Sequence, residues 1–257
     1  MNTYFYHGNN IINKIKTNYG ALENELEPFY THCYQPFHTA LMKIDGIEDA
    51  SVCEKVRILN VYYNDVEEFE RRYAIKSQSK FRSTILEEFN GYLFKDLPEI
   101  KELQLDFFNK GIYAGLKIDH RGQIAILTKD VDFCIGKRFV LTLDRQHLEV
   151  IIPLVAVEVK TYLDATMYNE VQYSMQTIKN ATPNVRAYLL MERNEVKEDK
   201  IIASKADSPL DEIFVVRGRR DHEIDDKTVY QFYSEVCTTL RTNLKTGLKM
   251  PGRLFNP

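Results

Sequence analysis

The stretch Leu148–Lys160, with the sequence LEVIIPLVAVEVK, decides the fold. It is apolar over most of its length and is interrupted by Pro153. A nearly continuous apolar run of this kind is typical of a central strand that is covered on both faces. The run ends in Glu158-Val159-Lys160, so the strand turns abruptly charged where it leaves the core. We expect a functional site at that end.

The elements expected around this strand follow the order helix, strands, helix, strand. Apolar residues at helical spacing predict helices, and alternating or wholly apolar runs bounded by turn residues predict strands. This order predicts an α/β or α+β fold, with a central mixed β-sheet flanked by helices. The expected helices are 80–94, 166–179 and 228–244, and the expected strands are 112–118, 123–128, 184–191 and 213–216, with a turn at 119–122 and an irregular tail over 246–257.

The segment Asp130–Ile135 (DVDFCI) alternates strictly between polar and apolar residues. Alternation with a period of two predicts a strand, with Asp132 on its polar face. A break in regular structure is expected near 136–138, where a glycine precedes two basic residues.

Residues 1–75 are expected to be mainly helical, because apolar residues recur there at helical spacing. The charge of this part leans negative, and it contains no repeat. We therefore expect a helical N-terminal region over 1–75 that packs on the main domain, supports a dimer or contacts the substrate. The main domain would span 76–257 and include the C-terminal helix.

The composition is that of an ordinary globular chain. Of 257 residues, 44% are hydrophobic and 28% are charged, with 11 Gly and 8 Pro, which excludes collagen-like and low-complexity chains. No apolar run approaches the roughly 20 residues of a membrane-spanning helix. The start, MNTYFYHGNN, lacks a signal-peptide pattern, so we expect an intracellular protein. The net charge of −3 neither requires nor excludes nucleic acid.

The four cysteines are far apart in the sequence and include no CxxC pair, which argues against a zinc ribbon. A site made of His32, Cys33, His38 and Cys53 would fit no common ligand spacing. The simpler interpretation is four reduced thiols in a reducing compartment.

Three polar side chains are expected to converge at the charged end of the central strand. Residues i and i+2 of a strand share a face, so Glu158 and Lys160 project together, and Asp132 joins them if the two strands are neighbours. Two carboxylates with the backbone carbonyl of Val159 suit Mg²⁺, which takes oxygen ligands and keeps several waters. Lys160 beside such a metal orients or deprotonates a water. The set therefore favours metal-dependent phosphodiester hydrolysis.

A simpler interpretation of the Glu-x-Lys pattern also exists. Such a pair on a strand is often a surface ion pair that contributes little to stability. The pattern gains weight here because an apolar run precedes it, because Asp132 lies on a polar strand face, and because a helix that bears glutamates comes earlier.

Asp132 followed by Glu158-Val159-Lys160 resembles the motif of the PD-(D/E)xK nuclease superfamily. The blocks Lys80–Phe94, KDVDFCIG (Lys129–Gly136) and VEVKTYLDATM (Val157–Met167), in this order along the chain, resemble type II restriction endonucleases of the BbvCI kind. The resemblance covers roughly residues 75–220. One departure is that Val131, and not a proline, precedes the aspartate.

The resemblance implies the role of each site residue. Asp132 and Glu158, with the carbonyl of Val159, would bind Mg²⁺, and Lys160 would position or activate the attacking water. An acidic residue on the first helix often supports such a site, and Glu88 matches by its position beside the apolar stripe of 80–94. Glu87 is the fallback, and a solvated helix face is the alternative for both.

Several further residues are candidate contacts to DNA, each with a simpler alternative. Arg217, Arg219 and Arg220 end a strand at a glycine-containing loop, where they would contact DNA or pair with nearby acidic residues. Basic residues between the two expected strands are placed to meet a phosphate backbone, and two glutamines share a face of the following helix or lie on its solvated surface. These are Lys137, Arg138, Arg145, Gln172 and Gln176, with Thr161 as a phosphate contact and Asp164 as a helix cap.

The first hypothesis is a type II restriction endonuclease that uses Mg²⁺ to hydrolyse double-stranded DNA at a specific sequence and leaves 5′-phosphate ends, in a prokaryotic cytoplasm. One active site cuts one strand, so we expect a homodimer, or one subunit of a heterodimer. The alternatives are a repair or recombination nuclease of the same fold that reads DNA structure, and a non-catalytic DNA-binding protein whose Glu-x-Lys is an ion pair.

Overall fold

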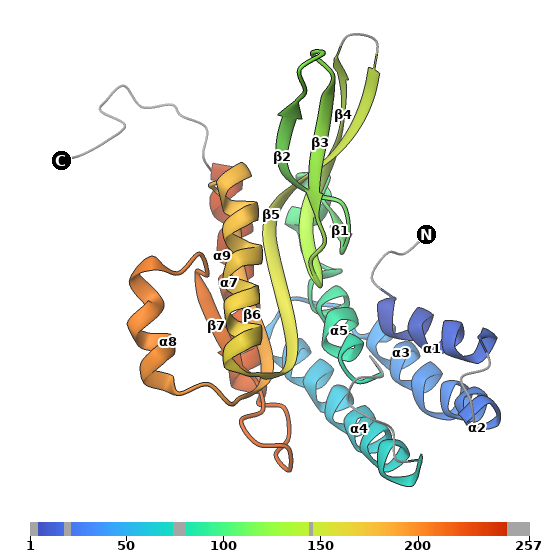
Figure 1. Cartoon of the computed structure of the whole chain (residues 1–257). Coiled ribbons are helices and arrows are strands. Elements are labelled where there is room, and N and C mark those ends of the chain that lie inside the picture. The colour runs from blue at the N-terminus through green and yellow to red at the C-terminus, as the bar shows by residue number, and fades with distance from the viewer. Residues whose placement is uncertain (1–4, 18–21, 74–80, 144–145, 246–257) are drawn as a thin grey trace.

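The computed structural model describes residues 5–17, 22–73, 81–143 and 146–245, and within these residues seven strands form one mixed sheet (Figure 1). The strands are β1 (Asp106–Phe108), β2 (Ile112–Ile118), β3 (Ile124–Lys129), β4 (Phe133–Leu143), β5 (Gln146–Leu163), β6 (Arg186–Asn194) and β7 (Glu212–Val215). The helices are α1 (Tyr6–Lys16), α2 (Glu23–Phe29), α3 (Gln35–Lys43), α4 (Asp49–Tyr73), α5 (Thr84–Phe94), α6 (Pro98–Glu102), α7 (Ala165–Ala181), α8 (Glu198–Ser204) and α9 (Asp226–Lys245), with a π-helical turn over Tyr30–Tyr34 and a 3-10 turn over Lys205–Asp207. The expected mixed sheet flanked by helices is confirmed.

β5 is the central strand, as its apolar run predicts. One edge of β5 pairs antiparallel with β4 from Gln146 to Val157, and the other edge pairs parallel with β6 from Val155 to Leu163. β2 pairs parallel with β5 at Ile151 and antiparallel with β3. β6 also pairs parallel with β7. The carboxyl ends of β5, β6 and β7 therefore lie at one end of the sheet.

β4 differs from its expected course at both ends. Asp132 lies in a bend just before the strand, which starts at Phe133. The expected break near 136–138 is wrong, because β4 continues to Leu143. Its pairing with β5 shifts register between Ile135 and Gly136, and a β-bulge of this kind absorbs an extra residue without ending the strand.

Each face of the sheet is covered by its own apolar layer. Val155, Val157 and Val159 of β5 belong to a cluster that includes residues of α4, α5 and α9. Ala156 of β5 and Cys134 of β4 belong to a second cluster, with residues of α7. Figure 1 shows α7 and α9 on opposite sides of β6. Because successive side chains of a strand point to opposite faces, Glu158 shares the α7 face with Ala156.

The N-terminal helices share their core with the sheet. The described part of 1–75 is mainly helical, as expected, and one cluster joins Ile11 of α1, Leu59 of α4, Phe89 of α5 and Leu240 of α9. The boundary near residue 75 stays a prediction, and the expected tail over 246–257 lies outside the described residues. No helix in the described part of the chain is long and apolar enough to cross a membrane.

The register shift in β4 depends on a glycine. A Cβ on Gly136 would lie 2.7 Å from the carbonyl oxygen of Ile152 in β5, a backbone atom that cannot move without disturbing the central pair of strands. We expect Gly136→Ala to lower the free energy of unfolding by about 1–3 kcal/mol, as overpacking does. Urea unfolding measures this loss. Val140→Ala, on an exposed position of the same strand, is the control and should cost under about 1 kcal/mol. An equal loss in both variants would contradict the steric argument.

Candidate active site

Asp132, Glu158 and Lys160 meet at the end of the β4–β5 ladder. The Lys160 Nζ lies 3.0 Å from the Glu158 Oε2 and 3.2 Å from the Asp132 Oδ2, and it donates a hydrogen bond to each. The sequence-based prediction that these three side chains converge is confirmed.

The register of the two strands produces this convergence. Phe133 and Val157 form the last pair of the β4–β5 ladder, so Asp132 and Glu158 come next on the two strands, where pairing ends. The backbone N–H of Val159 donates a hydrogen bond of 2.8 Å to the Asp132 Oδ2 and so fixes that carboxylate at the edge of β5. In an extended strand the N–H and C=O of one residue point to the same edge, which places the Val159 carbonyl beside Asp132.

The three side chains differ in their access to solvent. Lys160 and Asp132 each expose about a quarter of the side chain, at 26% and 27%, whereas Glu158 exposes 11%. Ser174 of α7 donates a hydrogen bond of 3.3 Å to the Glu158 Oε1. Glu158 therefore forms the floor of a site whose other two groups reach solvent.

Burial and neighbouring charges shift the pKa values of Glu158 and Lys160. Burial, followed by the charge of Asp132, raises the pKa of Glu158 to about 7, against the opposing effect of Lys160. Burial alone would lower the pKa of Lys160, but Asp132 and Glu158 outweigh it and raise that pKa above its ordinary value. The site thus brings two carboxylates close enough to disfavour each other's charge, with one ammonium group between them.

The donor set fits a hard divalent cation. Within the described residues no three His, Cys, Asp or Glu side chains gather as a metal site, so the candidate set is the Asp132 and Glu158 carboxylates with the Val159 carbonyl. Oxygen donors of this kind, in a number that leaves positions for water, are what Mg²⁺ takes. The alternative site of His32, Cys33, His38 and Cys53 is not formed, since His38 bonds Tyr92 and Cys53 bonds Asp49.

The structure corrects the expectation for Glu88. Its carboxylate is fully buried and accepts hydrogen bonds from the Gly8 N–H and from the hydroxyls of Tyr34 and Tyr92. The apolar layer around α5 lies on the face of the sheet opposite to Glu158, so Glu88 joins α1 and the π-helical turn to α5 and does not reach the site. Glu87, the fallback, is half-buried near Tyr6, and its role stays a prediction.

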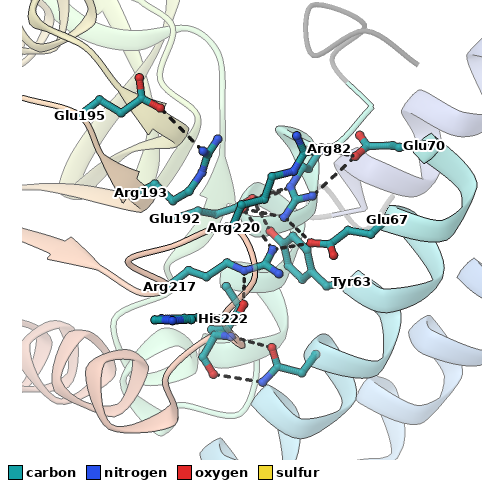
Figure 2. Close-up of polar contacts among 12 residues, drawn as sticks. Tyr63, Glu67, Glu70, Arg82, Glu192, Arg193, Glu195, Arg217, Arg220 and His222 are labelled. Carbon is teal, nitrogen blue, oxygen red and sulfur yellow. Dashed lines mark hydrogen bonds and ion pairs between the residues drawn. The ribbon is translucent and has the colours of Figure 1, made fainter. Parts of the chain in front are cut away.

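The structure also corrects the expectation for Arg217, which is buried and not available to DNA. Its Nη1 lies 2.7 Å from Glu67 and 3.7 Å from Glu192, its Nε donates to the carbonyl of His222, and its guanidinium covers the ring of Tyr63. Figure 2 shows Arg217 and Arg82 gathered around Glu192 and Tyr63, between α4 and the end of β6.

The other candidate DNA contacts are spread over the surface. Arg219 and Arg220 are exposed, and Arg138 is half-exposed with an ion pair of 2.7 Å to Glu149. Lys137 donates to the carbonyl of Leu103. Gln172 bonds Tyr168 and Ser208, Gln176 is exposed and bonds Asn180, Thr161 is half-buried, and Arg145 lies outside the described residues. Asp164 caps α7 as expected, accepting from the N–H groups of Thr166 and Met167.

Sequence reasoning missed two groups that shape this end of the sheet. Ser174 lies on the inward face of α7, the helix after β5, a position that its spacing from Val171 and Ile178 could have indicated. Glu192 follows the apolar run of β6 and is 1% exposed. Its burial depends on Arg82 and Arg217, which lie far away in the sequence, and no local signal marks it.

Known proteins match the chain in sequence and in structure. The family model of the Bpu10I restriction endonuclease matches residues 78–244. The solved structure titled "native BbvCI A2B2 tetramer at low resolution" matches with a TM-score of 0.70 and 17% sequence identity, over 95% of this chain and 98% of that chain. A "Restriction endonuclease PspGI-substrate DNA complex" matches with a TM-score of 0.38 and 10% identity, over 91% of this chain and 93% of that chain. No curated protein matches the chain in sequence. The BbvCI match shows a shared fold.

Glu192 neutralises two buried arginines. Glu192→Gln would leave Arg82 and Arg217 with less compensating charge in the interior, so we expect the free energy of unfolding to fall by about 3 kcal/mol. Glu54→Gln is the control, because it removes one partner of an exposed ion pair with Arg57 and should cost under about 1 kcal/mol. Chemical denaturation measures both. Equal stability of the two variants would mean that the buried cluster contributes nothing specific.

Burial raises the pKa of Glu88 to about 7, so its effect on stability depends on pH. A carboxyl whose folded pKa exceeds its unfolded value stabilises the fold below the unfolded pKa and loses that effect as pH rises through about 7. Between pH 5 and pH 8, wild type should therefore lose about 2 kcal/mol relative to Glu88→Gln. Denaturation at both pH values measures this difference. Glu68→Gln, on an exposed carboxylate, should track wild type, and the same behaviour for Glu88→Gln would refute the prediction.

Proposed function

The chain belongs to the Bpu10I restriction endonuclease family, and from that premise we propose that it is a type II restriction endonuclease that hydrolyses double-stranded DNA with Mg²⁺ and leaves 5′-phosphate ends. The family membership bears out the resemblance read from the three sequence blocks around Asp132, Glu158 and the helix of 80–94. A restriction enzyme meets its substrate inside the cell, so we also propose the cytoplasm of a prokaryote as its location.

The observation that carries the proposal is the meeting of Asp132, Glu158 and Lys160 at an open end of the sheet. An ion pair that served only stability would gain little from a second carboxylate next to a buried one, because the two repel. Here both carboxylates and the Val159 carbonyl face the place where β4 stops pairing with β5. That arrangement favours a site for a cation over a structural ion pair, and so speaks against the non-catalytic alternative.

Each group has a distinct role in the proposed reaction. Asp132 and Glu158 would hold Mg²⁺ together with the Val159 carbonyl. The metal, when bound, supplies a positive charge that stabilises the phosphorane-like transition state and lowers the pKa of a bound water. Lys160, whose pKa is raised by the two carboxylates, would orient the attacking water and offset charge on the scissile phosphate. Ser174 holds Glu158 in place from α7.

Cutting both strands requires two active sites. The chain supplies one Asp132–Glu158–Lys160 set in its described residues, so we propose a dimer, in which two copies or two related chains each cut one strand. The BbvCI match is titled an A2B2 tetramer, which supports oligomerisation by analogy of fold. A homodimer would match a palindromic site, and a heterodimer an asymmetric one.

Incubation of the purified protein with phage DNA tests the proposal. With Mg²⁺ we expect discrete fragments, and with EDTA none. Asp132→Asn, Glu158→Gln and Lys160→Ala should each reduce cleavage by about 100-fold or more, because each removes a group that acts in the transition state. Glu149→Gln, on an exposed carboxylate of the same strand, is the matched control and should cut like wild type.

The pattern of products separates the alternatives. Discrete double-strand fragments support a restriction enzyme that acts as a dimer of like chains, and nicks at discrete sites indicate one half of a heterodimer. Cleavage only of branched or damaged DNA would favour the repair nuclease. Full activity of Lys160→Ala would refute the assigned site.

A further inference from the structure

A polar cavity of about 500 Å³ lies at the carboxyl ends of β5 and β6, on the continuation of the strand that carries Lys160. Its walls include Thr161 of β5, Arg193 near the end of β6, and Arg82 and Arg220 from other parts of the chain. Figure 2 shows Arg193 on one side, and Arg82 and Arg220 in the middle between Arg193 and Glu70. Three arginines thus line one hollow although they come from three distant segments.

The arginines of this cavity hold hydrogen-bond donors that the described residues do not satisfy. The Nε of Arg193 and the Nη1 of Arg82 are buried, and neither makes a hydrogen bond to an acceptor among the described residues. A buried donor without an acceptor costs roughly 1–3 kcal/mol, so such groups call for a partner. An oxyanion in the cavity would be that partner, since guanidinium groups bind phosphate with paired hydrogen bonds.

The glutamates of the cavity leave these donors largely unused. Glu195 lies 3.7 Å from the Arg193 Nη1, and Glu70 lies 3.6 Å from the Arg82 Nη1 and 3.9 Å from the Arg220 Nη2. All three separations are longer than a hydrogen bond. Burial also raises the pKa of Glu70, which reduces its tendency to carry a charge. Arg82 is already paired with Glu67 and Glu192, so Arg193 and Arg220, which have only these distant carboxylates, are the main donors left for an anion.

The place of the cavity relative to Lys160 indicates which anion it binds. Tyr162, which also lines the cavity, shares the face of Lys160 two residues earlier on β5, and a strand advances about 3.3 Å per residue. Phosphates follow one another every 3.4 Å or so along the axis of one DNA strand. Ligands of open sheets with parallel strands bind outside the carboxyl ends of those strands, and β5 and β6 both end here.

We propose that the cavity binds a phosphate of the DNA backbone close to the phosphate that is cleaved, with Arg193, Arg220 and Arg82 as its donors. This inference rests on the proposed function, because it takes DNA as the substrate. Arg193 and Arg220 are positioning residues that fix the DNA strand, and they do not touch the reacting atoms. Arg82 has a second role, since its other nitrogens bond Glu67 and Glu192.

Salt-dependent DNA binding tests the proposal. The dissociation constant for a fluorescent duplex is measured by anisotropy from 50 to 300 mM salt, with EDTA present so that the DNA stays intact. The variants are Arg193→Gln and Arg220→Gln. The matched control is Arg186→Gln, at the amino end of β6, which is also partly exposed and also paired with one carboxylate. Arg220 exposes 68% of its side chain, so its variant should fold, and thermal unfolding verifies this for all three.

We expect Arg193→Gln and Arg220→Gln each to weaken binding by about fivefold or more and to lower the slope of log K against log salt by about 1, the change for one lost phosphate contact. Arg186→Gln should leave both values unchanged.

Slopes equal to wild type in both cavity variants would overturn the phosphate site, even with DNA still bound and cut by wild type. Stabilisation of wild type but not of Arg193→Gln by inorganic phosphate, with unchanged slopes, would make the cavity a free-anion site and overturn the proposal. Failure of wild type to bind any duplex would instead remove the proposed function itself.

Discussion

The antiparallel register between β4 and β5 holds the candidate site together. Because the ladder stops at the pair of Phe133 and Val157, Asp132 and Glu158 come next on the two strands, and the Val159 N–H is left to bind Asp132. The same register contains a bulge at Gly136. The Ile152 carbonyl oxygen lies so close to this position that it leaves no room for a Cβ atom, which favours glycine. A slip by one residue would turn Glu158 into the apolar layer of α5 and bring Val159 to the site, so fold and chemistry depend on one alignment.

Charge compensation follows from this geometry. Lys160 lies between two carboxylates that would otherwise repel, and Glu158 is buried enough for its pKa to reach about 7. A second charged cluster lies between α4 and the end of β6, where Glu192 joins Arg82 and Arg217 (Figure 2). It connects the helical layer to the end of the sheet where the candidate site lies. In the first cluster Asp132 and Lys160 reach solvent and suit a ligand, whereas in the second Glu192 and Arg217 are enclosed and suit packing.

The sequence predicted the meeting of Asp132, Glu158 and Lys160 because part of the signal was local. Glu158 and Lys160 are two residues apart on a strand, and their shared face follows from the pleat of the strand alone. The same local reasoning failed for Glu88 and Arg217. Glu88 lies at the border of an apolar stripe, and the sequence does not distinguish a buried from a solvated residue at such a position. In the structure Glu88 is buried and accepts hydrogen bonds from three donors, on α1, in the π-helical turn and on α5 itself. Arg217 looked free because its partners, Glu67 and Glu192, are distant in the sequence.

Most of the longer elements, the central strand and the pair of residues at its charged end follow from the sequence, because hydrophobic periodicity and side-chain alternation act over a few residues. The short elements β1, α6 and α8 and the full length of β4 did not. The tertiary structure alone decided which charges are enclosed and which are open. Burial and ion pairing depend on segments that are distant in the sequence and lie together only in the folded chain. Arg82, Arg193 and Arg220 line one cavity in this way, and their spacing in the sequence does not predict it. The three arginines line the same hollow only because the turn before α5, the end of β6 and the loop after β7 come together there.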